Sequence, residues 1–230
     1  MSLEYPTHGC EVIPFLPQSR LEGMRQAIAE RIDAAVAVSR IPLGSRFPEE
    51  TLERRLQRIA GFDKALAEEV LMAVYSDAHK DERIAFLDGY APLRAIAGNL
   101  VGKEIRSFTI RVRANVPGLP GRRQGWHSDV SILDGGEFAR VKIACWLPLV
   151  DAHAGNGTLE VVPGIRAFPM AHEGGPAGHT IREEDLEGFG KRIVDCDAGN
   201  AVFLDAFVPH RALPNPGDEV RWSVVTWMMV

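Results

Sequence analysis

His127 and Asp129 are the residues of this chain best suited to bind a metal ion, and a single residue separates them. Residues 125–133 are expected to form a strand, on which side chains two positions apart project from the same face. An imidazole nitrogen and a carboxylate oxygen would then approach one metal ion from adjacent directions. Because such a pair is also common as a surface ion pair or around a hydrogen-bonded core histidine, it indicates a metal site only when a third ligand joins it.

A second histidine, His210, could be that third ligand. Two histidines and one carboxylate form the facial triad of non-haem Fe(II) oxygenases, which leaves coordination positions open. The sequence Asn215-Pro216-Gly217-Asp218 predicts a turn, with proline at its second position and, at its third, a glycine with positive φ. This turn should fold the chain into a hairpin that places His210, Arg221 and Ser223 on one face of a sheet.

Arg221 indicates which co-substrate such a site would use. Arginine is the side chain best suited to bind a carboxylate through two parallel hydrogen bonds. A dicarboxylate such as 2-oxoglutarate could chelate Fe(II) through its keto-acid end, while its far carboxylate meets Arg221 with help from Ser223. The residues alone therefore favour an Fe(II) site that could bind a dicarboxylate such as 2-oxoglutarate.

Four blocks of sequence between Gly125 and Ser223 resemble one known family. The blocks are Gly125–Asp129, Ala144–Asp151, Gly155–Gly164 and Gly199–Ser223. In these blocks, and in their order, the chain resembles the phytanoyl-CoA dioxygenase branch of the Fe(II)/2-oxoglutarate oxygenases. The resemblance implies a double-stranded β-helix, which is a jelly roll related to the cupins, with N-terminal helices packed around it.

The resemblance also implies roles for individual residues. It assigns Fe(II) to His127, Asp129 and His210, and the far carboxylate of 2-oxoglutarate to Arg221 and Ser223. It places Trp146 against the co-substrate, with Thr109 on the preceding strand as a further candidate. One departure is that Ile165-Arg166 follows Pro163-Gly164, where family members often have Ser or Thr and then His. That departure leaves the metal site intact and points to a difference in substrate handling.

The implied reaction consumes O₂ and converts 2-oxoglutarate to succinate and CO₂ while a small-molecule substrate is hydroxylated. Halogenating relatives replace the carboxylate ligand by a small residue, so Asp129 favours hydroxylation, or a related desaturation or ring closure. A cupin-like zinc or manganese protein that catalyses isomerisation or hydrolysis is the alternative enzyme, and it would not need Arg221 beside His210. A non-catalytic binding module that has lost its activity is a third possibility. It is disfavoured because His127, Asp129, His210 and Arg221 are all present.

The elements that would position these residues change character along the chain. Residues 1–102 are expected to be mostly helical and residues 103–230 to form the jelly-roll core of one α+β domain. Apolar spacing predicts helices with these side chains on one face: Leu21, Met24, Ile28 and Ile32 after a Ser19 cap; Leu52, Leu56 and Ile59; Leu66, Val70 and Val74 after an Asp63 cap; and Leu93, Ile96 and Leu100. Strands are predicted at 105–115, 125–133, 141–150, 159–162, 192–196, 201–204 and 220–229. Residues 169–190 are expected to form a long surface loop with His172 and His179 exposed.

The composition limits the range of partners. A net charge of −5 and the absence of a long apolar run argue against nucleic-acid and membrane partners. The three separated cysteines, Cys10, Cys145 and Cys196, predict reduced thiols in a cytoplasmic protein, and Cys145 and Cys196 are expected to be buried. The N-terminal residues do not resemble a secretory signal. Arginines are dense around residues 125–129, either as a solvated face or because the substrate is anionic: Arg106, Arg111, Arg113, Arg122, Arg123 and Arg140.

Overall fold

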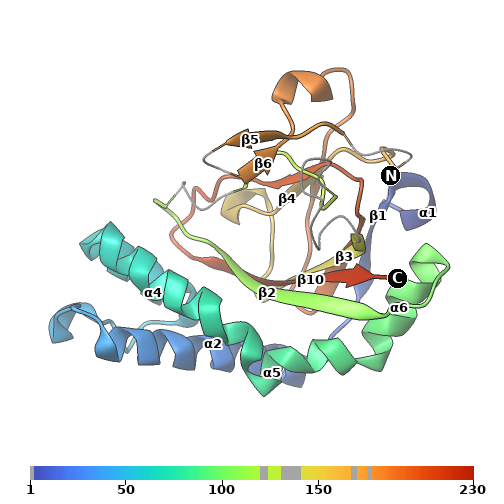
Figure 1. The fold of residues 1–230 in the computed structure, drawn as a ribbon. Coiled ribbons are helices and arrows are strands. Elements are labelled where there is room, and N and C mark those ends of the chain that lie inside the picture. The colour runs from blue at the N-terminus through green and yellow to red at the C-terminus, as the bar shows by residue number, and fades with distance from the viewer. Residues whose placement is uncertain (1–2, 120–123, 131–140, 167–169, 176–177) are drawn as a thin grey trace.

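The first hundred residues form helices that cover one face of a sheet (Figure 1). The computed structural model describes residues 3–119, 124–130, 141–166, 170–175 and 178–230. Its helices are α1 (Tyr5–His8), α2 (Gln18–Val38), α3 (Leu52–Phe62), α4 (Lys64–Asp77), α5 (Glu82–Ala85) and α6 (Ala91–Val101). Short 3₁₀ turns lie at Leu43–Ser45, Ala78–Lys80, Phe86–Gly89, Ala154–Asn156 and Glu183–Leu186. No helix within these ranges is long and apolar enough to cross a membrane.

The predicted helices are confirmed, with small shifts at their ends. The four predicted apolar side chains of α2, from Leu21 to Ile32, are buried. That helix begins at Gln18 after Pro17, so Ser19 lies inside the first turn and is not its cap. Asp63 does cap α4, since its carboxylate accepts hydrogen bonds from the amides of Ala65 at 2.8 Å and Leu66 at 3.2 Å.

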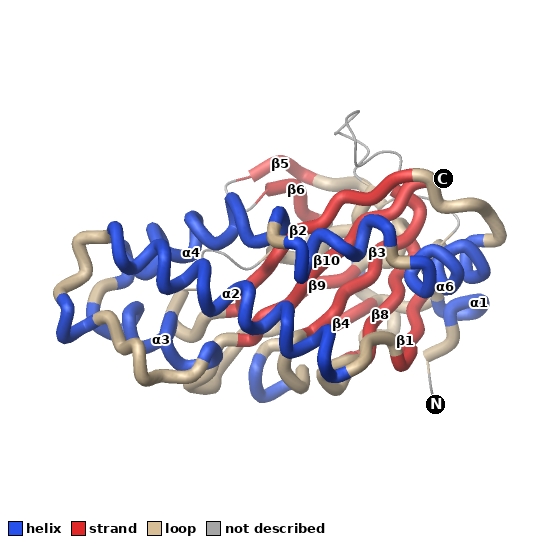
Figure 2. Tube along the Cα trace, turned by 90° about the horizontal axis from the view of Figure 1, so that it is seen from below, coloured by secondary structure: helices blue, strands red, loops and turns tan. Residues whose placement is uncertain are grey.

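The remaining chain forms two facing antiparallel sheets, as expected for a jelly roll. The larger sheet has the order β1 (Cys10–Pro14), β8 (Asn200–Asp205), β3 (Val141–Pro148), β10 (Arg221–Met229) and β2 (Ser107–Asn115). The smaller sheet has the order β7 (Arg192–Val194), β4 (Leu159–Val161) and β9 (His210–Ala212). In Figure 2, which views the molecule from below, the helices lie over the strands of the larger sheet.

Alternation along β10 divides the interior into two regions. Trp222 and Val224 face the helices and belong to a cluster of buried side chains that contains residues of both the helices and the sheet. The helices and the sheet therefore share one buried core. Arg221, Ser223 and Trp227 point the other way, into the space between the two sheets. The larger sheet therefore packs against the helices on one face and carries polar side chains on the other.

The predicted hairpin between His210 and Arg221 is wrong. Strand β9 pairs with β4 in the smaller sheet, with His210 opposite Val161, whereas Arg221 begins a strand of the larger sheet. The connecting segment crosses from the smaller sheet to the larger one, so β9 and β10 do not pair with each other as the two strands of a hairpin would. The Asn215 side chain holds it by donating to the carbonyls of Asn115 and Glu219. Gly217 has no positive φ, so the predicted turn type is also wrong.

Two further predictions fail locally. Within the described part of 125–133, only His127 forms a β-bridge, so this segment is not a regular strand. The described part of 169–190 is not one irregular loop, since it contains the paired strands β5 (Glu173–Gly175) and β6 (Gly178–Thr180) and the 3₁₀ turn at 183–186. Ile181 and Leu186 of this region pack in a small buried cluster with Trp126.

The three cysteines are free and buried, as predicted for Cys145 and Cys196, and Cys10 is buried as well. Burial raises the pKa of the Cys10 and Cys196 thiols to about 12, and it raises the pKa of Cys145 as well. Because the thiolate is the reactive form, these side chains are inert apolar fillers.

Candidate metal centre

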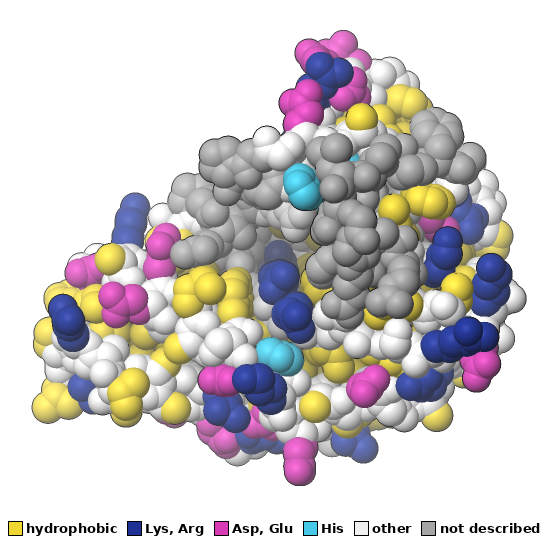
Figure 3. Space-filling model, in the orientation of Figure 1, with side chains coloured by type: hydrophobic (Ala, Val, Ile, Leu, Met, Phe, Trp, Pro, Cys, Tyr) yellow, Lys and Arg dark blue, Asp and Glu magenta, His cyan; other side chains and the backbone are white. Residues whose placement is uncertain are grey.

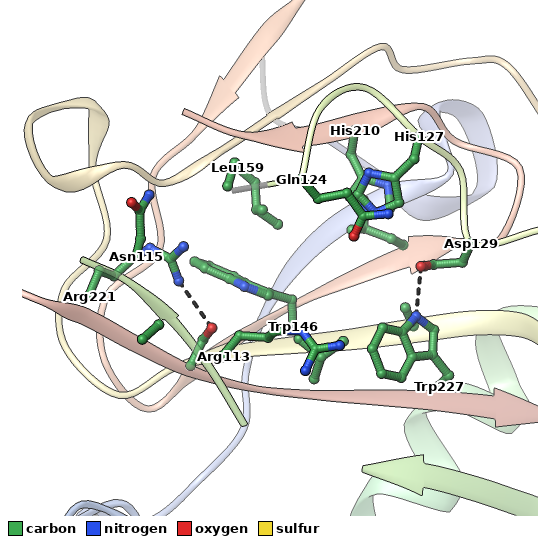
Figure 4. A pocket seen from close by; sticks show the side chains of 16 residues that line it. Arg113, Asn115, Gln124, His127, Asp129, Trp146, Leu159, His210, Arg221 and Trp227 are labelled. Carbon is green, nitrogen blue, oxygen red and sulfur yellow. Dashed lines mark hydrogen bonds between the residues drawn. The ribbon is translucent and has the colours of Figure 1, made fainter. Parts of the chain in front are cut away.

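His127 and His210 lie side by side although they come from different parts of the chain (Figure 4). Their backbones form an antiparallel bridge in which the amide of His127 donates to the carbonyl of His210 at 3.0 Å and the reverse bond measures 2.8 Å. The two ring centroids are 4.2 Å apart. The bridge therefore places both imidazoles at one edge of the smaller sheet.

Each histidine ring is oriented by a backbone carbonyl two residues earlier. Nδ1 of His127 lies 2.9 Å from the carbonyl oxygen of Gly125, and Nδ1 of His210 lies 3.0 Å from that of Val208. A carbonyl only accepts, so both Nδ1 atoms donate to it, and Nε2 of each ring is the nitrogen that can face a metal. Burial lowers the pKa of His127 well below its ordinary value, and the neighbouring His210 lowers it further. The ring of His127 is therefore neutral, which is the form that binds a metal.

Asp129 offers one oxygen to the protein and one to the centre. Its Oδ1 accepts a 2.6 Å hydrogen bond from the indole Nε1 of Trp227. Its Oδ2 is buried and has no hydrogen-bond partner among the residues that the structure describes. Burial raises the pKa of Asp129, although His210 and the Trp227 hydrogen bond lower it. A buried carboxylate oxygen without a partner is costly, and a cation would compensate it.

The three side chains together fit a metal ion. One ligand atom from each of His127, Asp129 and His210 lies within 4.8 Å of the other two, and they are the described residues that form such a group. Two neutral imidazoles and one carboxylate are the donor set of the facial triad. The orphaned oxygen of Asp129 is the observation that best supports the fit.

Arg221 is a buried guanidinium at the other end of the same space. Its Nε donates to the carbonyl of Gly157 at 2.9 Å, and its Nη1 donates to Oγ of Ser223 at 3.0 Å. The guanidinium also stacks 4.9 Å from the ring of Trp146. Burial lowers its pKa to about 10, so it stays charged at neutral pH. No carboxylate of the described chain pairs with it, and a buried unpaired charge calls for an anionic ligand.

A cavity of about 120 Å³ joins the two ends. The three candidate metal ligands line one end of it and Arg221 with Ser223 the other. Between them the wall is partly apolar, with Trp146, Leu159, Leu204 and Val225 among the lining residues. The predicted residues, apart from Thr109, therefore meet in one enclosed space, although His210 and Arg221 face one another across it from different sheets.

Thr109 is not among the residues that line this cavity. It lies on β2 opposite Trp227 and borders a shallower hollow with His79 and Arg111. The residue of β2 beside Arg221 is instead Asn115, which sequence reasoning missed. Its amide donates to the carbonyls of Gly157 and Leu213 and so fixes the loop that holds Arg221.

His172 is a second residue that sequence reasoning missed. It is buried, with 4% of its surface exposed, so the prediction of an exposed loop residue is wrong. Its Nε2 accepts a 3.0 Å hydrogen bond from the amide of Ser128, and its Nδ1 lies 2.9 Å from the carbonyl of Met170. It thereby connects the region 170–186 to the segment that carries His127 and Asp129. No local pattern marks it, because the contact joins residues far apart in sequence.

Arg166 stands where family members often have His, and its contacts are structural ones. Its guanidinium donates to the carbonyls of Tyr5 and Pro6 and lies 3.4 Å from the carboxylate of Asp205. It also stacks over the Tyr5 ring at 4.9 Å. Arg166 does not line the cavity of the metal centre. Its contacts with Tyr5, Pro6 and Asp205 instead attach the N-terminal turn to the larger sheet.

Comparison with known proteins agrees with this geometry. A family model described as phytanoyl-CoA dioxygenase (PhyH) matches residues 9–223. No curated protein sequence matches the chain.

Several solved structures share the fold. One is EvdO2 from Micromonospora carbonacea var. aurantiaca in complex with 2-oxoglutarate, with 19% identity, a TM-score of 0.63, and 99% of this chain and 89% of that chain covered. Another is EctD from S. alaskensis with 2-oxoglutarate and 5-hydroxyectoine, with 18% identity, a TM-score of 0.62, and 98% and 74% covered. A third is the α-ketoglutarate-dependent carbocyclase SnoK from nogalamycin biosynthesis, with 20% identity, a TM-score of 0.61, and 98% and 81% covered. These likenesses establish a common jelly-roll fold.

Proposed function

Since the chain belongs to the phytanoyl-CoA dioxygenase family of iron- and 2-oxoglutarate-dependent oxygenases, we propose that it hydroxylates a small-molecule substrate with release of succinate and CO₂. In this proposal His127, Asp129 and His210 bind Fe(II). Arg221 and Ser223 hold the far carboxylate of 2-oxoglutarate, with Trp146 alongside. Bound Fe(II) and 2-oxoglutarate would supply the activation of O₂ that oxidises a substrate C–H bond.

The observation that carries the proposal is that one end of the cavity is suited to bind a cation and the other end is suited to bind an anion. At one end two imidazole lone pairs and an orphaned carboxylate oxygen call for a cation. At the other end a buried guanidinium calls for an anion. A short dicarboxylate that chelates a metal satisfies both ends at once.

The protein's own residues would then divide the work. Backbone carbonyls bind Nδ1 of both imidazoles and so direct Nε2 of each ring toward the metal. Trp227 occupies one oxygen of Asp129, which favours binding of the metal through the other oxygen alone. The apolar wall limits water in the cavity and strengthens the attraction between Arg221 and a carboxylate.

A zinc or manganese enzyme for isomerisation or hydrolysis is the second candidate. It would account for the ligands but not for Arg221, since such a reaction needs no buried guanidinium held toward the metal cavity. The unpaired charge therefore favours the 2-oxoglutarate enzyme.

Anaerobic addition of Fe(II) and 2-oxoglutarate tests the proposal. We expect a weak visible charge-transfer band, and succinate formation once O₂ and a substrate from a metabolite panel are supplied. Both should be absent from His127→Ala and Asp129→Ala, and retained in Asp195→Ala, which removes an exposed carboxylate elsewhere. A fully active Asp129→Ala enzyme would contradict the proposal.

A further inference from the structure

Arg113 is a second guanidinium at the cavity, and it has no role in holding the co-substrate described above. It lines the cavity from β2, where it lies opposite Ser223. Its Nη1 donates to the carbonyl of Val112 at 3.2 Å, and its guanidinium lies 5.7 Å from the rings of both Tyr75 and Trp227. The side chain is therefore held in place by rings and by its own backbone, with donors left over for a ligand.

Arg111 repeats this situation two positions earlier on the same face of β2. Its Nη1 donates to the carbonyl of Ile110 at 2.8 Å, and it borders the neighbouring hollow with His79. Neither Arg111 nor Arg113 forms an ion pair with any described carboxylate. Figure 3 shows Lys or Arg side chains near the middle of the molecular face that it draws.

Arg111 and Arg113 differ from those arginines of the described chain that use the available carboxylates. The chain carries 31 acidic residues against 26 lysines and arginines, and Arg54 and Arg83 each contact two carboxylates. Like charges that are neighbours on one strand face repel each other. Arg113 lines the cavity and Arg111 lines the neighbouring hollow, which Asp88 also borders. Two neighbouring guanidiniums without an ion-paired carboxylate among the described residues suit the binding of an anion.

The position of Arg113 separates it from the co-substrate end. Figure 4 shows its guanidinium between the indoles of Trp146 and Trp227, whereas Arg221 lies beyond Trp146. The Trp227 ring that Arg113 faces donates to Asp129, so Arg113 is one indole away from the candidate metal. An anion bound there would hold the carbon atoms next to it near the metal.

We propose that Arg113, assisted by Arg111, binds an acidic group of the primary substrate, either a carboxylate or a phosphate. This inference rests on the proposed function, because it takes Arg221 as the site of 2-oxoglutarate. Arginine suits both groups, since its planar fork donates two parallel hydrogen bonds. The substrate class is thus a small organic acid or phosphate ester with its oxidised carbon close to the acidic group.

Matched pairs of charged and neutral probes test this inference. Hexanoate is compared with methyl hexanoate, and benzyl phosphate with benzyl alcohol. Binding is measured by the change in the charge-transfer band of the Fe(II)–2-oxoglutarate enzyme. We expect one charged member to bind and its neutral partner to bind about 10- to 100-fold more weakly, as for loss of a charge-assisted hydrogen bond. The two pairs distinguish carboxylate from phosphate.

The variant Arg113→Gln should weaken binding of the charged probe by a similar factor and leave the KM for 2-oxoglutarate, measured as succinate formation without added substrate, within about twofold. Arg106→Gln is the matched control, because it removes an exposed arginine that does not line the cavity. Equal binding of charged and neutral probes would overturn the inference, and so would a raised KM for 2-oxoglutarate in Arg113→Gln. If the wild-type enzyme with Fe(II) and 2-oxoglutarate showed no charge-transfer band, the proposed function itself would be overturned.

Discussion

The hydrogen bond from Trp227 controls which oxygen Asp129 offers at the centre. Without the indole N–H, the carboxylate could rotate or bind through both oxygens, and the preorganised geometry would be lost. We expect Trp227→Phe to weaken Fe(II) binding about 10- to 100-fold, as is typical when a group that orients a metal ligand is removed. An anaerobic Fe(II) titration against a competing chelator measures this.

Trp222→Phe is the matched control for that change. It removes an indole N–H on the same strand that donates to the carbonyl of Leu52 on the helix side, at 3.2 Å. This control should lower the free energy of unfolding and leave Fe(II) affinity unchanged. Equal Fe(II) affinities in the wild type and in Trp227→Phe would show that the bond to Asp129 has no orienting role.

At Arg221 the shape of the cation matters as much as its charge. Lysine keeps the charge but cannot donate to Gly157, Ser223 and a carboxylate in one plane. We expect Arg221→Lys to raise the KM for 2-oxoglutarate at least about tenfold, by loss of a charge-assisted bidentate contact. Steady-state succinate formation measures KM, and Fe(II) affinity without 2-oxoglutarate should not change. An unchanged KM would place the co-substrate elsewhere.

At the scale of elements, the loop at Gly157 positions the far end of the cavity. Gly157 has φ of +81°, and a Cβ on it would lie 2.2 Å from Nδ2 of Asn115 and 2.8 Å from the carbonyl oxygen of Leu213. Its own carbonyl accepts from Arg221 and Asn115. We expect Gly157→Ala to lower the free energy of unfolding by about 2–4 kcal/mol, from positive φ and the clash together, and to raise the KM for 2-oxoglutarate.

Gly164→Ala separates these two causes. Gly164 has φ of +92°, and a Cβ there would meet no atom within 4 Å. It should therefore lose only the roughly 1–2 kcal/mol that a left-handed conformation costs, without a change in KM. Denaturant unfolding gives both values, and equal losses for the two variants would mean that the Asn115 contact adds nothing.

Elements could be predicted from sequence where they are long and regularly patterned. Strand β10 is a long run rich in β-branched and aromatic residues, and α2 carries a complete apolar stripe, so both were predictable. Strand β9 has only three residues and no alternation, and its partner β4 lies far back in the chain. Its pairing is decided by the packing of two sheets, which no local pattern records, and the hairpin prediction failed for that reason.

The site shows the same division. His127, Asp129, His210 and Arg221 could be proposed from the sequence because their residue types are rare in combination and suit one chemistry. Trp227, His172 and Asn115 act through partners that only the fold brings near. Tryptophan, histidine and asparagine are so often structural that nothing in the sequence separates these from others of their kind.

At the scale of the whole molecule, the candidate metal centre joins residues that belong to both sheets. His210 belongs to the smaller sheet and Asp129 is bonded to Trp227 of the larger sheet, while the segment that carries His127 and Asp129 is bridged to His210 and bonded to His172. A metal that binds all three would connect the two sheets at this edge. Binding to the folded state alone must therefore add to its stability.

We expect Fe(II) at about 100 times its Kd to raise the free energy of unfolding by about 2.7 kcal/mol. For a chain of this size that corresponds to a rise in Tm on the order of 5–10 °C. Anaerobic thermal unfolding with and without Fe(II) measures it. Asp129→Ala should show no rise, because a triad without its carboxylate cannot balance the cation, whereas Asp195→Ala should show the full rise. A rise of the same size in Asp129→Ala would mean that Fe(II) stabilises the protein from another site, and the two sheets would then owe nothing to the centre described here.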